Sequence, residues 1–265
     1  MAKALVVETE ESEDLQDKVE HAKDVIRKAV EEYDNIGVAC SFGKDSMVVV
    51  HLAREVDPTI PIFSVMTAYK PEDTFRYLRR MNTEMNLGVT VYMVADEVPE
   101  LLRGDDLEVK LLPTDEFRGV ASLYSGTNQE IYRVDPDECC RLLKVEPTRE
   151  AVKYLDAWVA GLRNTEGRVR EDYEEIEDRG GLVKINPILT FTEAEVLQYL
   201  QEQGIPLHPW YTKEFPDGRS YRSLGCEPCT EPIHPDQLER EGRWLNTSKC
   251  GGECGIHTRQ LKERS

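Results

Sequence analysis

The sequence of 265 residues lacks any run of 18 apolar residues, so we expect no transmembrane helix. Its first residues, MAKALVVETEESEDLQ, also lack a basic region followed by an apolar stretch, so a signal peptide is not expected. Both absences predict a cytosolic protein without membrane association. Internal repeats are absent as well, and the length suits one large α/β domain or a domain with a small appendage.

Basic residues are few: 33 lysines and arginines stand against 51 acidic residues, a net charge of −18. An acidic chain repels phosphate backbones, which argues against nucleic-acid binding. The acidity is explained by solvation of the surface, or alternatively by adaptation to a salty cytosol, in which screening weakens self-repulsion.

The apolar pattern predicts strands alternating with helices. Strands are expected at 36–40, 60–66, 89–95, 158–162 and 182–185, and helices at 15–33, 47–56, 73–85 and 192–203, the last capped by Thr192 and ended by Gly204. This alternation predicts an α/β fold, with a parallel sheet covered by helices on both faces. We expect residues 1–204 to form a nucleotide-binding domain, and residues 205–265, rich in Pro, Gly and Cys, to form an irregular segment folded over the site.

A polar loop, SFGKDS, joins the first strand to its helix, at the edge of the sheet where α/β proteins bind ligands. Backbone N–H groups at a helix N-terminus form an anion cradle, and a lysine adds a charge. The alternative is an ordinary turn with a serine cap. The predicted nucleotide-binding residues are Ser41, Phe42, Gly43, Lys44, Asp45 and Ser46.

This loop resembles the SGGKDS loop of the adenine-nucleotide α-hydrolases, the PP-loop group. The resemblance implies a Rossmann-like fold and an adenine nucleotide. It does not select the reaction, because the group includes ATP pyrophosphatases, one sulfate adenylyltransferase subunit and sulfonucleotide reductases.

The cysteine count is odd, which argues against a disulfide framework and for metal binding or catalysis. Four thiols come as two pairs, Cys139-Cys140 and Cys226/Cys229, and suit either zinc or an iron–sulfur cluster. Side chains of adjacent cysteines diverge, so they chelate one small ion poorly but can each reach a separate iron of a cubane. This favours [4Fe–4S], although the C-x-x-C element alone also fits a zinc or redox knuckle. Cys40 lies in an apolar strand and is expected to be a buried small hydrophobe.

Six strings, read together, resemble the assimilatory adenylyl-sulfate reductases of the PAPS reductase family, over about residues 24–257. They are CCRLLKVEP, AWVAGLR, KINPILTFTEAEVLQYL, GCEPCT, EREGRW and KCGGECGIH. The resemblance implies a [4Fe–4S] cluster that tunes electrostatics rather than donating electrons. It also implies that Cys254 attacks adenylyl sulfate, that AMP leaves, and that a thioredoxin-like dithiol releases sulfite from a thiosulfonate on Cys254.

Cys254, near the C-terminus, stands on a glycine-flanked tail, which suits a thiol that moves in and out of a pocket. His257 would lower the pKa of this thiol or orient it. Cys250, four residues earlier, is a bystander or a resolving thiol. Anionic phosphate and sulfonyl groups require cations, and the candidates are Lys144, Arg163, Arg240 and Arg243, with Arg240 equally well explained as a surface cation.

Two departures from the reductase pattern keep other functions open. Lys44 and Asp45 are retained, as in ATP-cleaving relatives, and Met66-Thr67-Ala68 replaces the family's D-T-G string. The alternatives are a PP-loop ATP pyrophosphatase with the same cluster, a reductase of the 3′-phosphorylated sulfonucleotide, and a non-catalytic redox-sensing nucleotide-binding protein. The oligomeric state is left open, a homo-oligomer included.

Overall fold

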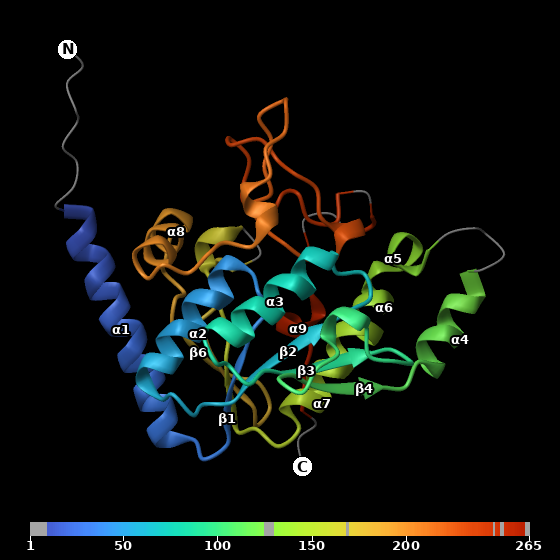
Figure 1. Ribbon diagram of the computed structural model, residues 1–265, viewed down its shortest axis with the longest axis horizontal. Helices are drawn as coiled ribbons and strands as arrows, with labels where there is room; N and C mark the ends of the chain where they lie inside the picture. Colours follow the sequence, from blue (N-terminus) through green and yellow to red (C-terminus); the bar gives the residue numbers. More distant parts are fainter. Residues whose placement is uncertain (1–9, 125–129, 168–169, 246, 250–251, 263–265) are drawn as a thin grey trace.

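The structure is a computed structural model that describes residues 10–124, 130–167, 170–245, 247–249 and 252–262. Its centre is a seven-stranded sheet of order β4-β3-β2-β1-β5-β7-β6 (Figure 1). The strands are β1 (Ile36–Ala39), β2 (Ile62–Met66), β3 (Thr90–Val94), β4 (Glu108–Leu112), β5 (Ala157–Val159), β6 (Ile176–Asp178) and β7 (Val183–Ile185). All neighbours pair in parallel except β6 and β7. The predicted α/β fold is confirmed, with one antiparallel edge strand in addition.

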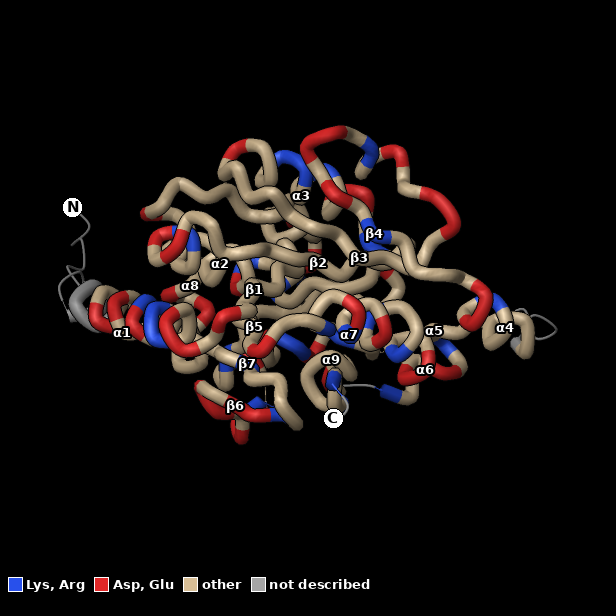
Figure 2. The backbone as a smooth tube through the Cα atoms, turned by 90° about the horizontal axis from the view of Figure 1, so that it is seen from below, with Lys and Arg blue, Asp and Glu red and all other residues tan. Residues whose placement is uncertain are grey.

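Helices cover both faces of this sheet, and Figure 2 shows α3 on one side of β1–β3 with α7 and α9 on the other. The α-helices are α1 (Glu10–Glu32), α2 (Lys44–Val56), α3 (Glu72–Glu84), α4 (Asp115–Tyr124), α5 (Ile131–Val134), α6 (Pro136–Cys140), α7 (Glu146–Val152), α8 (Glu193–Glu202) and α9 (Gly255–Thr258). A π-helical turn, η3 (Arg141–Val145), joins α6 to α7. Short 3₁₀ turns are η1 (Glu100–Leu102), η4 (Asn164–Glu166), η6 (Pro209–Thr212) and η7 (Glu227–Cys229).

Alternate residues of each strand enter two separate cores, as the period of two in a strand requires. Ile62 of β2 packs with the helices α1, α2, α3 and α8, whereas its neighbour Phe63 packs with Tyr92, Trp158 and Val152 on the other face. Both faces are therefore apolar, which explains why the strands appear as continuous apolar runs in the sequence.

The predicted elements of the first half are found within a few residues of their expected ends. The helix expected after the SFGKDS loop is α2, although its sequence MVVVHLAREV is rich in β-branched residues. Thr192 caps α8 through a capping box with Glu195, and Gly204 adopts φ +65° beyond the helix end.

Several elements were not predicted. The outer strands β4 and β6 carry charged residues, EVKLL and IED, and have no apolar run to mark them. Among the described residues no helix is long and apolar enough to span a membrane, as expected.

The segment after α8 crosses over the carboxyl ends of the strands, as Figure 1 shows in orange and red. Within its described part only η6, η7 and α9 are regular, so its irregular character is as expected. The backbone carbonyl of Arg222 accepts a hydrogen bond from the Lys44 ammonium, which ties this segment to the SFGKDS loop. The division of the chain at residue 204 stays a prediction.

Candidate active site

A polar cavity of about 160 Å³ lies where the SFGKDS loop meets the C-terminal segment. Its walls come from the carboxyl ends of β1, β2 and β5, from η3, and from the tail around α9. Of the residues predicted for the site, those lining the cavity are Ser41, Gly43, Asp45, Ser46, Lys144, Arg240, Arg243, Cys254 and His257. Folding thus brings together residues more than 200 positions apart.

A second cavity, of about 120 Å³, adjoins the first, because Ser41, Ser46 and His257 line both. Its walls include the rings of Phe63 and Trp158. The site therefore has a charged chamber and a largely apolar one, the division that a nucleotide with an anionic chain and a planar base requires.

The SFGKDS loop is held in a tight conformation. Phe42 has φ +60°, an unusual value for a residue other than glycine, and its buried ring packs edge-on against Tyr77. A Cβ on Gly161 would lie 2.8 Å from the backbone nitrogen of Ser46, so glycine is required where the chain beyond β5 passes the loop. Phe42 supports the loop from behind and does not line the cavity.

Three cations line the cavity without a carboxylate at ion-pair distance among the described residues. Lys144 and Arg243 were predicted from the sequence. Lys70 was not, although it lies four residues beyond the end of strand β2, at the edge where ligands bind. Burial, together with the charge of the nearby Lys144, lowers the pKa of Lys70 to about 8, as expected for two ammonium groups that share one cavity.

Two further arginines in the cavity wall are paired with buried carboxylates. Arg170 contacts Glu166 and donates to Glu253 at 2.6 Å, and Arg240 donates to the other oxygen of Glu253 at 3.0 Å. Arg240 is therefore a buried group, so its interpretation as a surface cation is wrong. Burial alone would raise the pKa of Glu253, but the charges of Arg170 and Arg240 outweigh it and hold this pKa well below its usual value. Sequence reasoning missed Arg170, Glu166 and Glu253. Glu166 and Arg170 lie only four residues apart, but no local pattern indicates that they are buried or that Arg170 pairs with Glu253, 83 residues later.

Glu253 also fixes the tail that carries the predicted nucleophile. Its carboxylate accepts a hydrogen bond from the backbone N–H of Cys254 at 2.7 Å. The two arginines therefore hold the cysteine tail in the cavity wall through one carboxylate.

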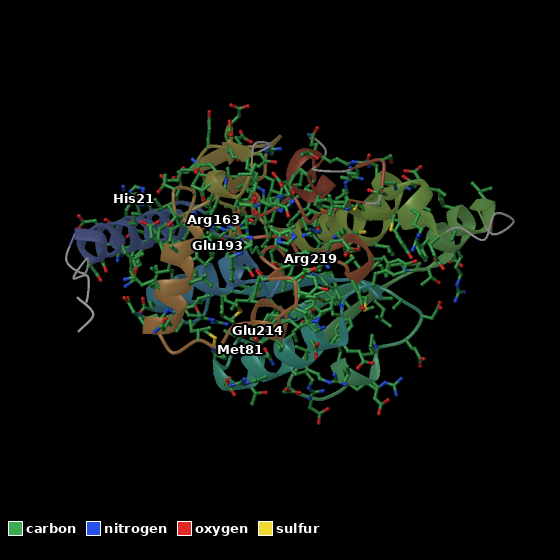
Figure 3. All side chains as sticks on the ribbon, turned by 90° about the horizontal axis from the view of Figure 1, so that it is seen from above. His21, Met81, Arg163, Glu193, Glu214 and Arg219 are labelled. Atoms are coloured by element: carbon green, nitrogen blue, oxygen red, sulfur yellow. The ribbon has the colours of Figure 1, made fainter. Side chains whose placement is uncertain are left out.

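Lys44 and Arg163 do not line the cavity. Lys44 is 2% exposed and contacts Glu239 at 2.5 Å, while fully buried Arg163 donates to both oxygens of Glu239 at 2.7 Å and to Asp45 at 2.5 Å. In Figure 3 Arg163 is labelled within the outline of the molecule. A role of Lys44 and Arg163 in substrate binding stays a prediction. Their ion pairs with Glu239 and Asp45 argue against it.

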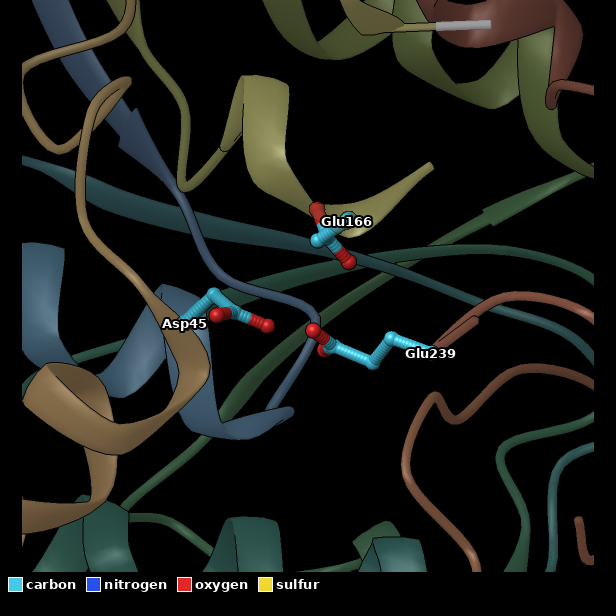
Figure 4. Close-up of side chains that lie close together, drawn as sticks. All are labelled: Asp45, Glu166 and Glu239. Atoms are coloured by element: carbon cyan, nitrogen blue, oxygen red, sulfur yellow. The ribbon is translucent and has the colours of Figure 1, made fainter. Parts of the chain in front are cut away.

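Three carboxylates gather beside these cations, and Figure 4 shows Asp45, Glu166 and Glu239 turned toward one another. One oxygen from each lies within 4.8 Å of the others, a spacing that a metal ion could use. Each already has a cationic partner: Arg163 for Asp45, Arg170 for Glu166, and Lys44 with Arg163 for Glu239. We therefore interpret the group as an ion-pair network.

The four paired cysteines, Cys139, Cys140, Cys226 and Cys229, are all buried and line one small enclosure beside the cavity. The hydroxyl of Thr67 lies 3.2 Å from the sulfur of Cys226, and Trp244 and Tyr69 enclose the group. Burial raises the pKa of Cys139 to about 12, whereas at Cys226 Lys144 and Lys70 outweigh burial and lower the pKa.

The spacing of these thiols fits a cluster better than a single zinc ion. Tetrahedral zinc with bonds of about 2.3 Å holds its sulfurs about 3.8 Å apart. Among the residues that the structure describes, the one group of three or more ligand atoms within 4.8 Å is the carboxylate group above, which contains no cysteine. Four buried thiols around one enclosure at wider spacing suit a cubane.

Cys254 lies beside this enclosure and also lines the polar cavity. A hydrogen bond from Cys140 and the charge of Lys144 lower its pKa well below the ordinary value, against the effect of burial. Since a cysteine bound to iron has no proton to donate, Lys144 is the part of this stabilisation that a loaded enzyme would retain. Cys250 lies outside the described residues.

His257 is placed differently from the expectation. Its ring stacks on Trp158 with centroids 6.0 Å apart, and burial lowers its pKa well below the usual value. A neutral imidazole adds no charge to stabilise the Cys254 thiolate. Its buried Nδ1 has no partner among the described residues, so it can contact a ligand that spans the two cavities.

The family model and the relatives of known name point to the same family. The model of the phosphoadenosine phosphosulfate reductase domain matches residues 35–232. The chain is 28% identical over 248 residues to the adenosine 5′-phosphosulfate reductase of Staphylococcus epidermidis, covering 92% of this chain and 90% of that one. It is 30% identical over 237 residues to the reductase of that name in Halalkalibacterium halodurans, with 88% and 90% covered. With 5′-adenylylsulfate reductase 1 of Arabidopsis thaliana it shares 31% over 277 residues, covering 98% of this chain but 53% of the plant protein.

Solved structures add a likeness of fold. The phosphoadenylyl-sulfate reductase of Candida auris, crystallised with phosphate, has a TM-score of 0.60 at 18% identity, covering 88% of this chain and all of that one. The FMN adenylyltransferase of Candida glabrata has a TM-score of 0.54 at 15% identity, covering 93% and 78%. These two enzymes differ in activity, so the fold alone does not select a reaction. The family model and the relatives identify the family: the chain belongs to the phosphoadenosine phosphosulfate reductase domain family.

Proposed function

We propose that this protein reduces adenylyl sulfate to sulfite and AMP in sulfate assimilation, with Cys254 as the nucleophile and a thioredoxin-like dithiol as the electron donor. The observation that carries the proposal is the position of Cys254, which stands in the cavity wall beside Lys144 and next to the four-cysteine enclosure. The cytosolic location remains part of this proposal.

The two cavities fit the two ends of such a nucleotide. The apolar chamber beside Trp158 would take the adenine ring, and the charged chamber would take the phosphosulfate. Lys70, Lys144 and Arg243 bring three cations without carboxylate partners among the described residues, so they can offset the anionic charge.

The reaction proceeds in two displacements. The Cys254 thiolate attacks the sulfonyl sulfur, an S–S bond forms, and the S–O bond to the phosphate breaks, with AMP leaving as the anion. One thiolate of the dithiol then attacks Sγ of Cys254 and expels sulfite, and the second thiol resolves the mixed disulfide. The dithiol loses two electrons as it becomes a disulfide, and the sulfonyl sulfur gains them as it leaves in sulfite. No further reductant is therefore needed.

Cys139, Cys140, Cys226 and Cys229 would hold the [4Fe–4S] cluster, which supplies a fixed charge next to the reacting groups. Lys144 lies between the cavity and this enclosure and lines both. Its ammonium stabilises the attacking thiolate and the departing oxygens from one position.

The decisive experiment compares Cys254→Ser with the parent enzyme, purified without oxygen. The variant should release no sulfite, because an alkoxide is far scarcer than a thiolate at neutral pH. It should keep its iron and its affinity for AMP. Without a dithiol, the parent enzyme given adenylyl sulfate should gain one sulfonate on the peptide containing Cys254, seen by mass spectrometry, and Cys250→Ser should keep that adduct. An adduct on another residue, or iron loss in Cys254→Ser, would refute these roles.

The pyrophosphatase alternative is disfavoured by one observation. The Lys44 ammonium, which ATP-cleaving relatives keep for the phosphates, is 2% exposed and contacts Glu239 instead of the cavity. Discrimination against the 3′-phosphorylated substrate is part of the proposal, and parallel assays with both sulfonucleotides test it.

A further inference from the structure

Lys44 is enclosed by groups that belong to this chain. Glu239 lies 2.5 Å from its nitrogen, the carbonyl of Arg222 accepts from it, and the ring of Tyr211 covers it with 5.0 Å to the centroid. Glu193 lies farther away, at 3.5 Å. These four residues come from the chain after residue 190, and Asp45 of the loop itself lies at 3.8 Å, so the C-terminal part of the protein supplies most of the polar surrounding of this loop lysine.

Glu239 holds a second cation at the same time. Arg163 donates to both of its oxygens at 2.7 Å, a bidentate geometry that fixes the carboxylate, and both side chains are buried. Glu239 therefore occupies the position in which a doubly anionic phosphate group would have to lie to contact Lys44 and Arg163 together.

We infer that Glu239 is a specificity-determining residue: its carboxylate substitutes for a phosphate at Lys44 and Arg163, and so closes the SFGKDS loop to pyrophosphate groups. A polyphosphate could reach Lys44 only by displacing a buried carboxylate that makes two bonds to Arg163 and one contact with Lys44. The chain thus retains the lysine and aspartate of an ATP-cleaving loop but uses them to anchor its own C-terminal segment. The inference rests on the proposed function only in that the site takes an adenosine 5′-phosphate.

A double-mutant cycle with inorganic pyrophosphate as the probe tests this, using isothermal titration of the iron-loaded protein. Glu239→Gln removes the charge and keeps the shape, so both cations become available. Pyrophosphate should bind this variant about tenfold or more tightly than the parent, the size of one charge-assisted hydrogen bond. Lys44→Gln should leave the affinity of the parent unchanged, and the double variant should lose the gain. Glu241→Gln, an exposed glutamate of the same segment, is the matched control and should bind as the parent does.

Three results would overturn the inference. The first is a tenfold loss of pyrophosphate affinity on Lys44→Gln in the parent, since Lys44 would then face ligand. The second is a folded, iron-loaded Glu239→Gln with unchanged affinity. The third needs no variant: release of pyrophosphate from ATP and Mg²⁺ by the parent enzyme. Sulfite release from adenylyl sulfate is assayed on the same samples, and its absence refutes the proposed function while leaving the pyrophosphate result interpretable by itself.

Discussion

Replacing Lys70 by methionine should slow sulfite formation without unfolding the protein. Its ammonium lines the polar cavity with Lys144 and has no carboxylate at ion-pair distance among the described residues. A hydrogen bond to a charged group contributes about 1.5–3 kcal/mol, so kcat/KM should fall about 10- to 150-fold. Removing an unpaired cation leaves no orphaned carboxylate, so the melting temperature should stay within about 2 °C of the parent.

Arg170 provides the contrast. Arg170→Met would leave the buried Glu166 without its ion-pair partner and would leave Glu253 with Arg240 alone. Breaking a buried pair in this way costs about 3–5 kcal/mol of folding free energy, so this variant should lose stability as well as activity. Comparing the two variants separates a cation that binds substrate from one that also supports the fold.

The assay measures sulfite release at saturating dithiol over pH 7 to about 9, for the parent, Lys70→Met and Lys70→Arg. With a pKa of about 8, Lys70 loses its charge as the pH rises through this range, so the KM of the parent should increase. Arginine stays protonated, so Lys70→Arg should show a flatter profile. Activity of Lys70→Met within twofold of the parent, or an unchanged KM profile in Lys70→Arg, would refute the role assigned to this residue.

Three further outcomes are expected. Cys226→Ser should lose most of the about four irons per chain that a cubane supplies, measured by iron analysis, whereas Cys40→Ser should retain them; stoichiometric zinc without iron would contradict the cluster. Thr192→Ala should lower the free energy of unfolding by about 1 kcal/mol in urea titrations, because it removes the side-chain cap of α8; an unchanged value would show that the cap contributes nothing. Burial lowers the pKa of His208 to about 4, so the unfolded chain binds the extra proton below pH about 6.5, and stability should fall by about 1 kcal/mol between pH 7.5 and 5.5. In His208→Gln that part of the pH dependence should vanish, and a persistent slope would assign it to other groups.

The sequence was most informative where local patterns decide the structure. The buried strands β1, β2 and β3 carry apolar runs, and α8 has a capping residue and a terminal glycine, so these elements could be predicted. Two of the five residues of the edge strand β4 are charged, and the strand gains its conformation from pairing with β3, which no local pattern encodes.

The site was predictable in its residue types but not in its pairing. Cys254 and Lys144 line the cavity as expected. Lys44 and Arg163 were expected to face phosphate, yet both contact Glu239, which lies 195 residues after Lys44 in the chain. Which carboxylate reaches which cation depends on how the C-terminal segment crosses the sheet, and spacing along the chain contains no information about that.

The wide turn η3 makes the segment between the paired cysteines and Lys144 intolerant of deletion. A π turn contains one residue more than an α turn. Cys140 comes directly before this turn, and Lys144 lies within it. Losing one residue there would restore α-helical geometry and rotate the preceding residues by about 100° relative to α7. Because α7 is fixed against β2 and β3, the cysteines would swing away from their enclosure. A variant that keeps the two adjacent thiols in their enclosure must therefore also keep the number of residues in this turn.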